Sequence, residues 1–166
     1  WFAGRVLPLP PPPGPLKSIG GLRLLPDRSV LSSDNTDLDA VAVIGSDLWS
    51  EVDAPDITPL LKDVLARGGI VGGICAGTLA LARAGLFEGR KHTSNGAGWI
   101  ESRLKTYAGS ELYQDVPHAV RDGHVVSAAG TAPGTFAVAF LEALFPEQAA
   151  QIAEMRDMIG REFQSG

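Results

Sequence analysis

The chain has 166 residues, 45% of them hydrophobic and 20% charged, which suits one compact domain with a hydrophobic core and is too little for two ordinary domains. The net charge of -5 and the lack of a basic run argue against nucleic acid as a partner. The single cysteine excludes an internal disulfide, and neither a membrane-spanning apolar run nor a signal-peptide pattern is present, so we expect a cytoplasmic protein that does not bind membranes.

The first 16 residues differ in composition from the rest. Six prolines lie between Pro8 and Pro15, and such a run removes backbone donors and favours an extended path. We therefore predict a proline-rich arm over residues 1–16 and an α/β domain over residues 17–166.

From residue 18 onward, short apolar runs alternate with amphipathic stretches. Ile19 and residues 22–25 flank Gly20-Gly21 and predict a short hairpin or a kinked strand pair. Continuous apolar runs predict strands buried on both faces, and apolar residues at helical spacing predict helices. In chain order these are a strand over 40–44, a helix over 55–67, a strand over 70–74, a helix over 76–84, a strand over 90–94 and a short helix over 99–107.

The last part of the chain predicts a hairpin and two helices. Asp122-Gly123 joins strands over 116–121 and 124–128, and helices follow over 135–144 and 148–163. The alternation of strands and helices in the whole chain is typical of a parallel α/β fold.

The most informative motif, Gly73-Ile74-Cys75-Ala76-Gly77, lies between a predicted buried strand and a predicted helix. It has the pattern of a nucleophile elbow with sulfur in place of a hydroxyl: a sharp turn lifts the side chain out at the carboxyl edge of the sheet, and the two elbow glycines avoid clashes with strand and helix. The following helix N-terminus favours a thiolate. A lone cysteine is more often a buried structural residue, but this context favours a nucleophile that is also open to oxidation.

Two backbone segments are candidates for an oxyanion hole beside Cys75. The Ala76 amide directly follows the nucleophile, and Gly45-Ser46 ends the neighbouring predicted strand. An ordinary strand-to-loop turn explains Gly45-Ser46 equally well.

Three histidines are candidates for a catalytic base. His92 is the best placed, on a predicted strand after the elbow helix, whereas His118 and His124 flank the Asp122-Gly123 turn, where we expect surface exposure. A structural role is an equally open alternative for each. The spacing of these residues predicts no metal site, and no nucleotide-binding glycine motif is present, so we expect no metal and no cofactor.

Residues 69–78 resemble the ThiJ/PfpI family of the class I glutamine amidotransferase-like superfamily. The resemblance continues over 85–95, returns at 122–128 and 130–136, and spans about residues 18–145. It implies a flavodoxin-like three-layer α/β sandwich with a mainly parallel sheet, and a homodimer. It also implies that Cys75 is the elbow cysteine and that Ala76 and Ser46 supply the oxyanion amides.

Three departures from the family pattern bear on catalysis. Many members have a glutamate, from the first βα unit, that hydrogen-bonds the cysteine; that unit should precede Ser18, where the proline-rich arm stands, so we expect it to be missing or altered. Where amidotransferase-like relatives often place a histidine, this chain has Asn95. The protease-type relatives carry a histidine directly after the cysteine, and here that residue is Ala76.

These observations leave three functional hypotheses. The first is a thiol-dependent hydrolase or a glyoxalase/deglycase-type enzyme acting on a small carbonyl or amide, with Cys75 as nucleophile and His92 as base. The second is a non-catalytic oxidative-stress or redox-sensing protein that uses oxidation of Cys75. The third is a dimeric scaffold that has lost its chemistry.

Overall fold

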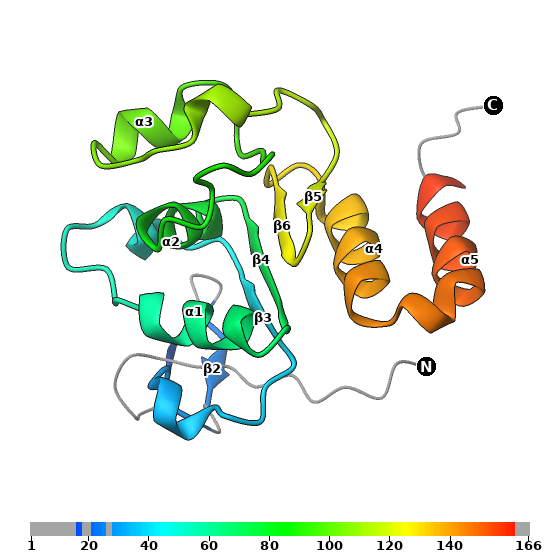
Figure 1. Ribbon diagram of the computed structural model, residues 1–166, viewed down its shortest axis with the longest axis horizontal. Helices are drawn as coiled ribbons and strands as arrows, with labels where there is room; N and C mark the ends of the chain where they lie inside the picture. Colours follow the sequence, from blue (N-terminus) through cyan, green and yellow to red (C-terminus); the bar gives the residue numbers. More distant parts are fainter. Residues whose placement is uncertain (1–15, 18–20, 26–27, 162–166) are drawn as a thin grey trace.

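A computed structural model describes residues 16–17, 21–25 and 28–161 of the chain, and its main element is a four-stranded sheet (Figure 1). The predicted arm over residues 1–16 lies, apart from Leu16, outside the described residues. The sheet has the order β3-β4-β6-β5, in which the first three strands are parallel and β5 is antiparallel to β6. Their bounds are Ala40–Val43 for β3, Ile70–Ile74 for β4, Val120–Asp122 for β5 and Val125–Ala128 for β6.

Helices cover both faces of this sheet (Figure 1). One apolar cluster joins α1 (Thr58–Ala66) and α2 (Gly77–Arg83) to the face that carries Val71. A second cluster joins α4 (Pro133–Leu144) to the face that carries Ile70, and α5 (Ala149–Gly160) packs on α4. Successive residues of β4 thus point into different layers, as strand geometry requires. The predicted flavodoxin-like three-layer fold is confirmed.

Two adjacent glycines allow helices to approach β4 closely from both sides. A Cβ atom added at Gly72 would lie 2.7 Å from the Phe140 ring of α4, and one at Gly73 would lie 3.0 Å from the Leu81 side chain of α2. Side chains on this strand would push the layers apart. The close packing fixes the end of β4, which Cys75 follows.

Strand β3 forms one edge of the sheet, and this corrects one expectation. Residues 40–44 were expected to be buried on both faces, but Ala42 is exposed and Ile44 is 71% exposed. Within the described part of the chain β3 pairs with β4 alone, and no parallel βα unit precedes it. The predicted N-terminal hairpin appears as a separate antiparallel pair of two-residue strands, β1 (Leu16–Lys17) and β2 (Arg23–Leu24); Ile19 and Gly20 lie outside the described residues.

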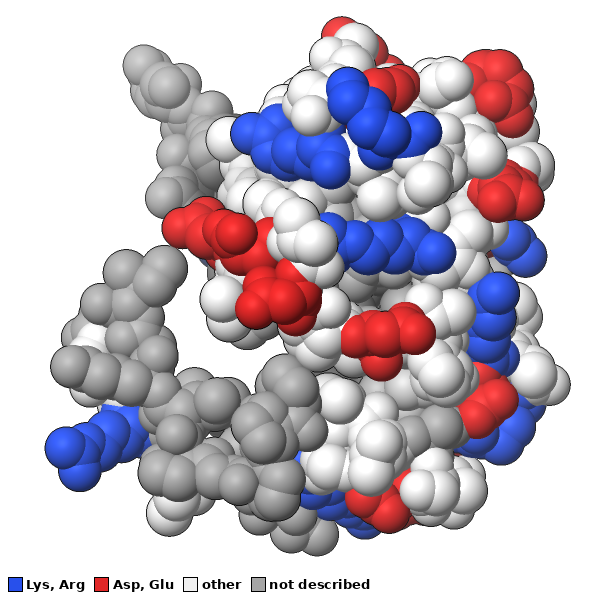
Figure 2. All heavy atoms as spheres, turned by 90° about the vertical axis from the view of Figure 1, so that its left-hand side faces the viewer, with Lys and Arg blue, Asp and Glu red and all other residues white. Residues whose placement is uncertain are grey.

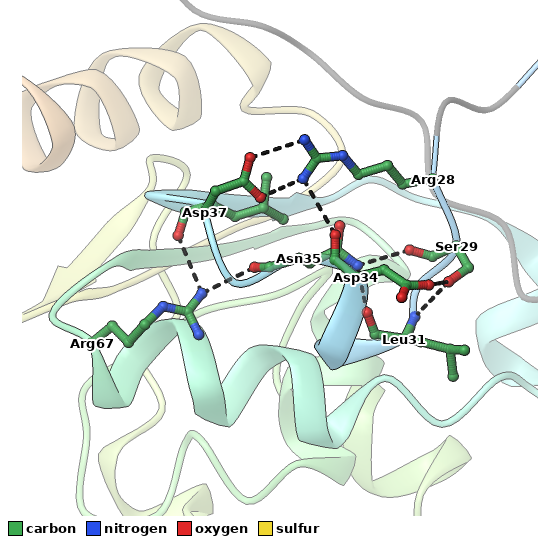
Figure 3. Close-up of polar contacts among 8 residues, drawn as sticks. Arg28, Ser29, Leu31, Asp34, Asn35, Asp37 and Arg67 are labelled. Carbon is green, nitrogen blue, oxygen red and sulfur yellow. Dashed lines mark hydrogen bonds and ion pairs between the residues drawn. The ribbon is translucent and has the colours of Figure 1, made fainter.

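A polar cluster fixes the chain just before β3 (Figure 3). Arg28 forms a salt bridge with Asp37 and donates a hydrogen bond to the Asp34 carbonyl at 3.3 Å. The buried Asn35 side chain donates to two backbone carbonyls, and its own backbone carbonyl accepts from Arg67, just after α1, at 3.2 Å. The start of β3 is therefore tied to α1.

The predicted strand over 90–94 is wrong. His92 makes only an isolated bridge with Tyr113, and the backbone N–H of Thr93 donates to the Ser127 hydroxyl at 2.9 Å. A side chain thus takes a donor that a strand ladder would need. The segment runs as an irregular connection, and this path brings its later residues to the sheet edge where Cys75 lies.

The other predicted elements are present with shifted ends. The short helix α3 (Trp99–Arg103) ends earlier than expected. The strand predicted over 116–121 begins only at Val120, and the β5–β6 hairpin turns at Gly123, whose φ is 59°. The 3₁₀ helix η2 (Asp47–Ser50), which Ser46 caps, was not predicted. Residues 162 and 163 of the predicted last helix lie outside the described residues.

Charge is mixed on the face that lies at the left of Figure 1. Figure 2 shows acidic and basic side chains interspersed on this face, and neither sign covers it. This face therefore offers no extended basic surface to a phosphate backbone. In the described ranges, no helix is both long enough and apolar enough to cross a membrane.

Candidate active site around Cys75

Cys75 occupies a sharp turn between β4 and α2. Its φ is 57°, and it is the one non-glycine residue with positive φ in the described part of the chain. Its N–H donates to the Ala128 carbonyl at 3.0 Å, and its own carbonyl accepts hydrogen bonds from the Thr78 hydroxyl at 2.6 Å and the Thr78 N–H at 3.1 Å. A left-handed conformation is unfavourable for a residue with a Cβ, so these bonds on both sides hold a strained turn. The turn leaves the thiol half-buried.

The sulfur lies between two glycines. A Cβ atom at Gly45, after β3, would lie 3.0 Å from the Cys75 Cβ and 3.3 Å from its Sγ. One at Gly130, after β6, would lie 2.9 Å from Sγ. Backbone therefore forms both walls of the slot that holds the thiol, and a Cβ on either wall would require the Cys75 side chain to shift.

Asn95 is the side chain that hydrogen-bonds the thiol. Its Nδ2 lies 3.6 Å from Sγ, and its Oδ1 accepts from the Gly130 N–H at 2.9 Å. The orientation of the amide follows from the second bond, because a backbone N–H can only donate and must face the oxygen. The donor end of Asn95 consequently faces the sulfur, where it stabilises a thiolate better than a thiol.

A hydroxyl pair ties the Asn95 segment to the elbow. The buried Thr78 and Ser94 hydroxyls lie 2.7 Å apart. Thr78 donates its one hydroxyl hydrogen to the Cys75 carbonyl, so Ser94 donates to Thr78. The residue before Asn95 is thus bonded to the first turn of α2.

The predicted oxyanion amides lie beside this slot. Ala76 is the N-cap of α2, and its nitrogen lies 3.6 Å from the position of a Cβ on Gly45. The first N–H groups of a helix lack intrahelical partners and are available to an anion. Ser46 follows Gly45 and uses its hydroxyl to accept from the Leu48 N–H at 3.4 Å. An oxyanion role for these amides stays a prediction.

The structure places His92 in a buried aromatic cluster. The ring is 0% exposed, stacks on Phe87 with centroids 4.1 Å apart, and has Tyr107 and Tyr113 at its edges. Its Nδ1 donates to the Arg90 carbonyl at 2.8 Å, so Nε2 is the bare nitrogen that accepts from the Tyr107 hydroxyl. Both ring nitrogens are therefore occupied away from the thiol, which argues against the predicted role of His92 as base.

Acid is expected to destabilise the protein through His92. Burial lowers the pKa of His92, because desolvation penalises the charged ring. The stability that the neutral ring contributes is present above about pH 6.5 and is lost as the pH falls from there through the folded-state pKa, by up to about 1.4 kcal/mol per pH unit. Urea unfolding at pH 7, 6 and 5 measures this loss. In His92→Gln the free energy of unfolding should depend less on pH between pH 7 and 5. An unchanged pH dependence in this variant would show that His92 does not cause the loss.

Other titratable groups do not reach the sulfur. In the described ranges no carboxylate or imidazole hydrogen-bonds Sγ, and His118 and His124 are exposed, as expected. No group of three or more His, Cys, Asp or Glu side chains that could hold a metal occurs in the same ranges. The chemistry available to this site is that of a half-buried thiol with the Asn95 amide beside it as a hydrogen-bond donor.

Sequence reasoning found part of this arrangement. It named Cys75, its elbow glycines and Gly45, and it noted Asn95 only as the place of a missing histidine. It did not single out Gly130, although that residue begins the Gly-Thr-x-Pro-Gly segment that carries the family resemblance. Nothing in the sequence indicated that the Tyr113 hydroxyl bonds the backbone on both sides of Asn95.

Comparisons with known proteins agree on one family. The model of the DJ-1/PfpI family matches residues 8–143. A DJ-1 superfamily protein from Agrobacterium tumefaciens is 36% identical, with a TM-score of 0.80 over 93% of this chain and 81% of that chain. A thiJ/pfpI family protein from Bacillus anthracis is 34% identical, with a TM-score of 0.68 over 80% of this chain and 62% of that chain.

Curated relatives are longer than the matched part of this chain. The Bacillus subtilis protein named "Uncharacterized protease YoaZ" is 34% identical over 129 residues, which are 78% of this chain and 61% of YoaZ. The chain thus spans less than two thirds of the length of YoaZ.

Proposed function

Because the chain belongs to the DJ-1/PfpI family, as its resemblance to ThiJ/PfpI proteins predicted, we propose that it is a thiol-dependent enzyme in which Cys75 attacks a small carbonyl compound. The observation that carries the proposal is the slot around the sulfur. Backbone at Gly45 and Gly130 leaves the thiol half-buried, and the Asn95 amide donates to it. Such a site admits a small electrophile and favours the nucleophilic form of the sulfur.

The first step needs no base once the thiolate has formed. A bond forms between Sγ and the carbonyl carbon, and the π electrons of the carbonyl move to its oxygen. The resulting alkoxide accepts hydrogen bonds from the Ala76 N–H and the Asn95 amide. Asn95 can donate but cannot take up a proton at neutral pH, so it stabilises the anion and does not act as the base.

Amide hydrolysis is the less favoured reaction of the same thiol. Cleavage of an amide requires a proton on the leaving nitrogen, whereas addition to an aldehyde or ketone expels no leaving group. In the described part of the chain no carboxylate or imidazole hydrogen-bonds the sulfur. The relatives YoaZ and YdeA from Bacillus subtilis are both named as uncharacterized proteases, which is the reason to test amides alongside carbonyls.

Removal of the thiol tests the proposal directly. We expect Cys75→Ala to lower turnover of an α-ketoaldehyde such as methylglyoxal by about 10³-fold or more, because the nucleophile itself is lost. Turnover of peptide amides is measured in parallel. His118→Ala, at an exposed position, is the matched control and should keep wild-type rates. Full turnover by Cys75→Ala would exclude the enzyme proposed here.

Redox sensing is the second candidate, and one observation favours it. Oxidation of a cysteine requires access to the sulfur but no catalytic base. Cys75 is only half-buried, and in the described part of the chain its one side-chain hydrogen bond comes from the neutral Asn95 amide. Mild peroxide treatment followed by intact-mass analysis distinguishes this role. Selective addition of one or two oxygens at Cys75, together with inactivity toward carbonyls, would support it. The homodimer and the cytoplasmic location stay predictions.

A further inference from the structure

The Tyr113 hydroxyl holds the backbone on both sides of Asn95. It accepts hydrogen bonds from the Ser94 N–H at 3.2 Å and from the Gly96 N–H at 3.1 Å. Asn95 lies between these two residues, and its side-chain amide donates to the Cys75 sulfur. A single oxygen atom thus fixes the peptide planes that carry the thiol's hydrogen-bond donor.

Tyr113 is itself held by the buried aromatic cluster. It follows the short helix η3 (Ser110–Leu112), and its ring meets the His92 ring edge-on, with centroids 5.7 Å apart and planes at 82°. The next residue, Gln114, donates its N–H to the His92 carbonyl at 2.7 Å. His92 is packed against Phe87 and is fully buried. The packing of the aromatic cluster therefore fixes the position of the Tyr113 hydroxyl.

We propose that Tyr113 is a positioning residue that keeps Asn95 in hydrogen-bond contact with Cys75 and thereby keeps the thiol reactive. The inference rests on the proposed function only in taking Cys75 as the reacting group. The residue acts through Asn95 and does not touch the sulfur.

Geometry makes this contact sensitive to small displacements. The distance from Nδ2 to Sγ is 3.6 Å, which is near the outer limit of a hydrogen bond to sulfur, so a shift of a few tenths of an ångström breaks it. Within the described residues no charged side chain hydrogen-bonds the sulfur. The Asn95 amide is the one side chain there that donates a hydrogen bond to it. The Ser94–Thr78 hydroxyl pair ties the same segment to α2, but it holds only the residue before Asn95.

The test measures the reactivity of the thiol and needs no substrate. The rate of alkylation of Cys75 by iodoacetamide is followed from pH 5 to 10 in the wild-type protein, Tyr113→Phe, Asn95→Ala and the double variant. Tyr113→Phe removes one oxygen atom and keeps the ring. Because one hydrogen bond to the thiolate is lost, we expect the pH midpoint of the alkylation rate to rise and the rate at neutral pH to fall by about three- to tenfold. In the Asn95→Ala background Tyr113→Phe should add nothing.

Tyr107→Phe is the matched control for general loosening of the cluster. It removes the same atom from a tyrosine that bonds His92 and makes no hydrogen bond to residues 94–96. We expect the pH midpoint to stay at the wild-type value in this variant. An equal shift in both tyrosine variants, additive effects of Tyr113→Phe and Asn95→Ala, or an unchanged midpoint in a folded Tyr113→Phe protein would each overturn the proposal. None of these outcomes depends on whether the enzyme turns over carbonyl compounds.

Discussion

Gly77→Ala is expected to destabilise the folded protein by about 3 kcal/mol or more, a large part of the roughly 5–15 kcal/mol typical of a domain. A Cβ atom at this position would lie 2.1 Å from the Val43 carbonyl oxygen and 2.8 Å from the Val43 carbonyl carbon. Both are backbone atoms of a buried residue paired with Gly73, so neither can move without shifting β3 from β4. Urea unfolding measures the loss.

Two other glycines provide a graded comparison. At Gly73 the added Cβ would meet the Leu81 side chain at 3.0 Å and the Gly77 carbonyl oxygen at 3.1 Å, so we expect a smaller loss, of about 1–2 kcal/mol. At Gly160, near the end of α5, nothing lies within 4 Å, and alanine there should be neutral or stabilise by up to about 1 kcal/mol. A Gly77→Ala protein within 1 kcal/mol of wild type would show that the elbow does not need its glycine.

The helices and strands whose residues show a clear hydrophobic pattern were predictable from the sequence. The strand over 70–74 comes from a continuous apolar run, and the helix α2 comes from an apolar stretch that ends before Gly85. The strand over 90–94 was wrongly predicted because its pattern does not reveal that Ser127 takes the Thr93 N–H. The exposure of β3 was missed because an apolar run carries no information about which strand lies at a sheet edge.

The candidate site was predictable only where one short motif encodes it. The elbow is local, and its glycines and cysteine can be read from five consecutive residues. The contact of Asn95 with the sulfur depends on Gly130, which lies 35 residues later, and on Tyr113, which comes from a third segment. His92 was placed near the thiol by chain order, whereas its neighbours in space are aromatic rings. Contacts among distant segments need the fold, and sequence spacing does not supply them.

Gly130→Ala is expected to slow the reaction of Cys75 sharply without unfolding the protein. The added Cβ would lie 2.9 Å from Sγ and 3.1 Å from the Cys75 Cβ, closer than ordinary van der Waals contact. An approaching electrophile would meet this methyl group, and crowding of about 1–3 kcal/mol corresponds to a rate lower by roughly ten- to a hundredfold. Gly130 is exposed and is not among the described glycines with positive φ, so alanine fits its backbone and only the Cys75 side chain has to shift. We therefore expect the free energy of unfolding to fall by about 1–2 kcal/mol, which leaves the protein folded.

The alkylation profile separates this steric effect from the loss of a hydrogen bond. Gly130→Ala should lower the plateau rate at high pH, where the sulfur is fully ionised, whereas Tyr113→Phe should move the pH midpoint and leave the plateau unchanged. Gly45→Ala places a Cβ 3.3 Å from Sγ on the opposite wall and should lower the plateau less. A Gly130→Ala protein with a wild-type plateau would mean that reagents reach the sulfur from another side, and the backbone slot would then not control access to the thiol.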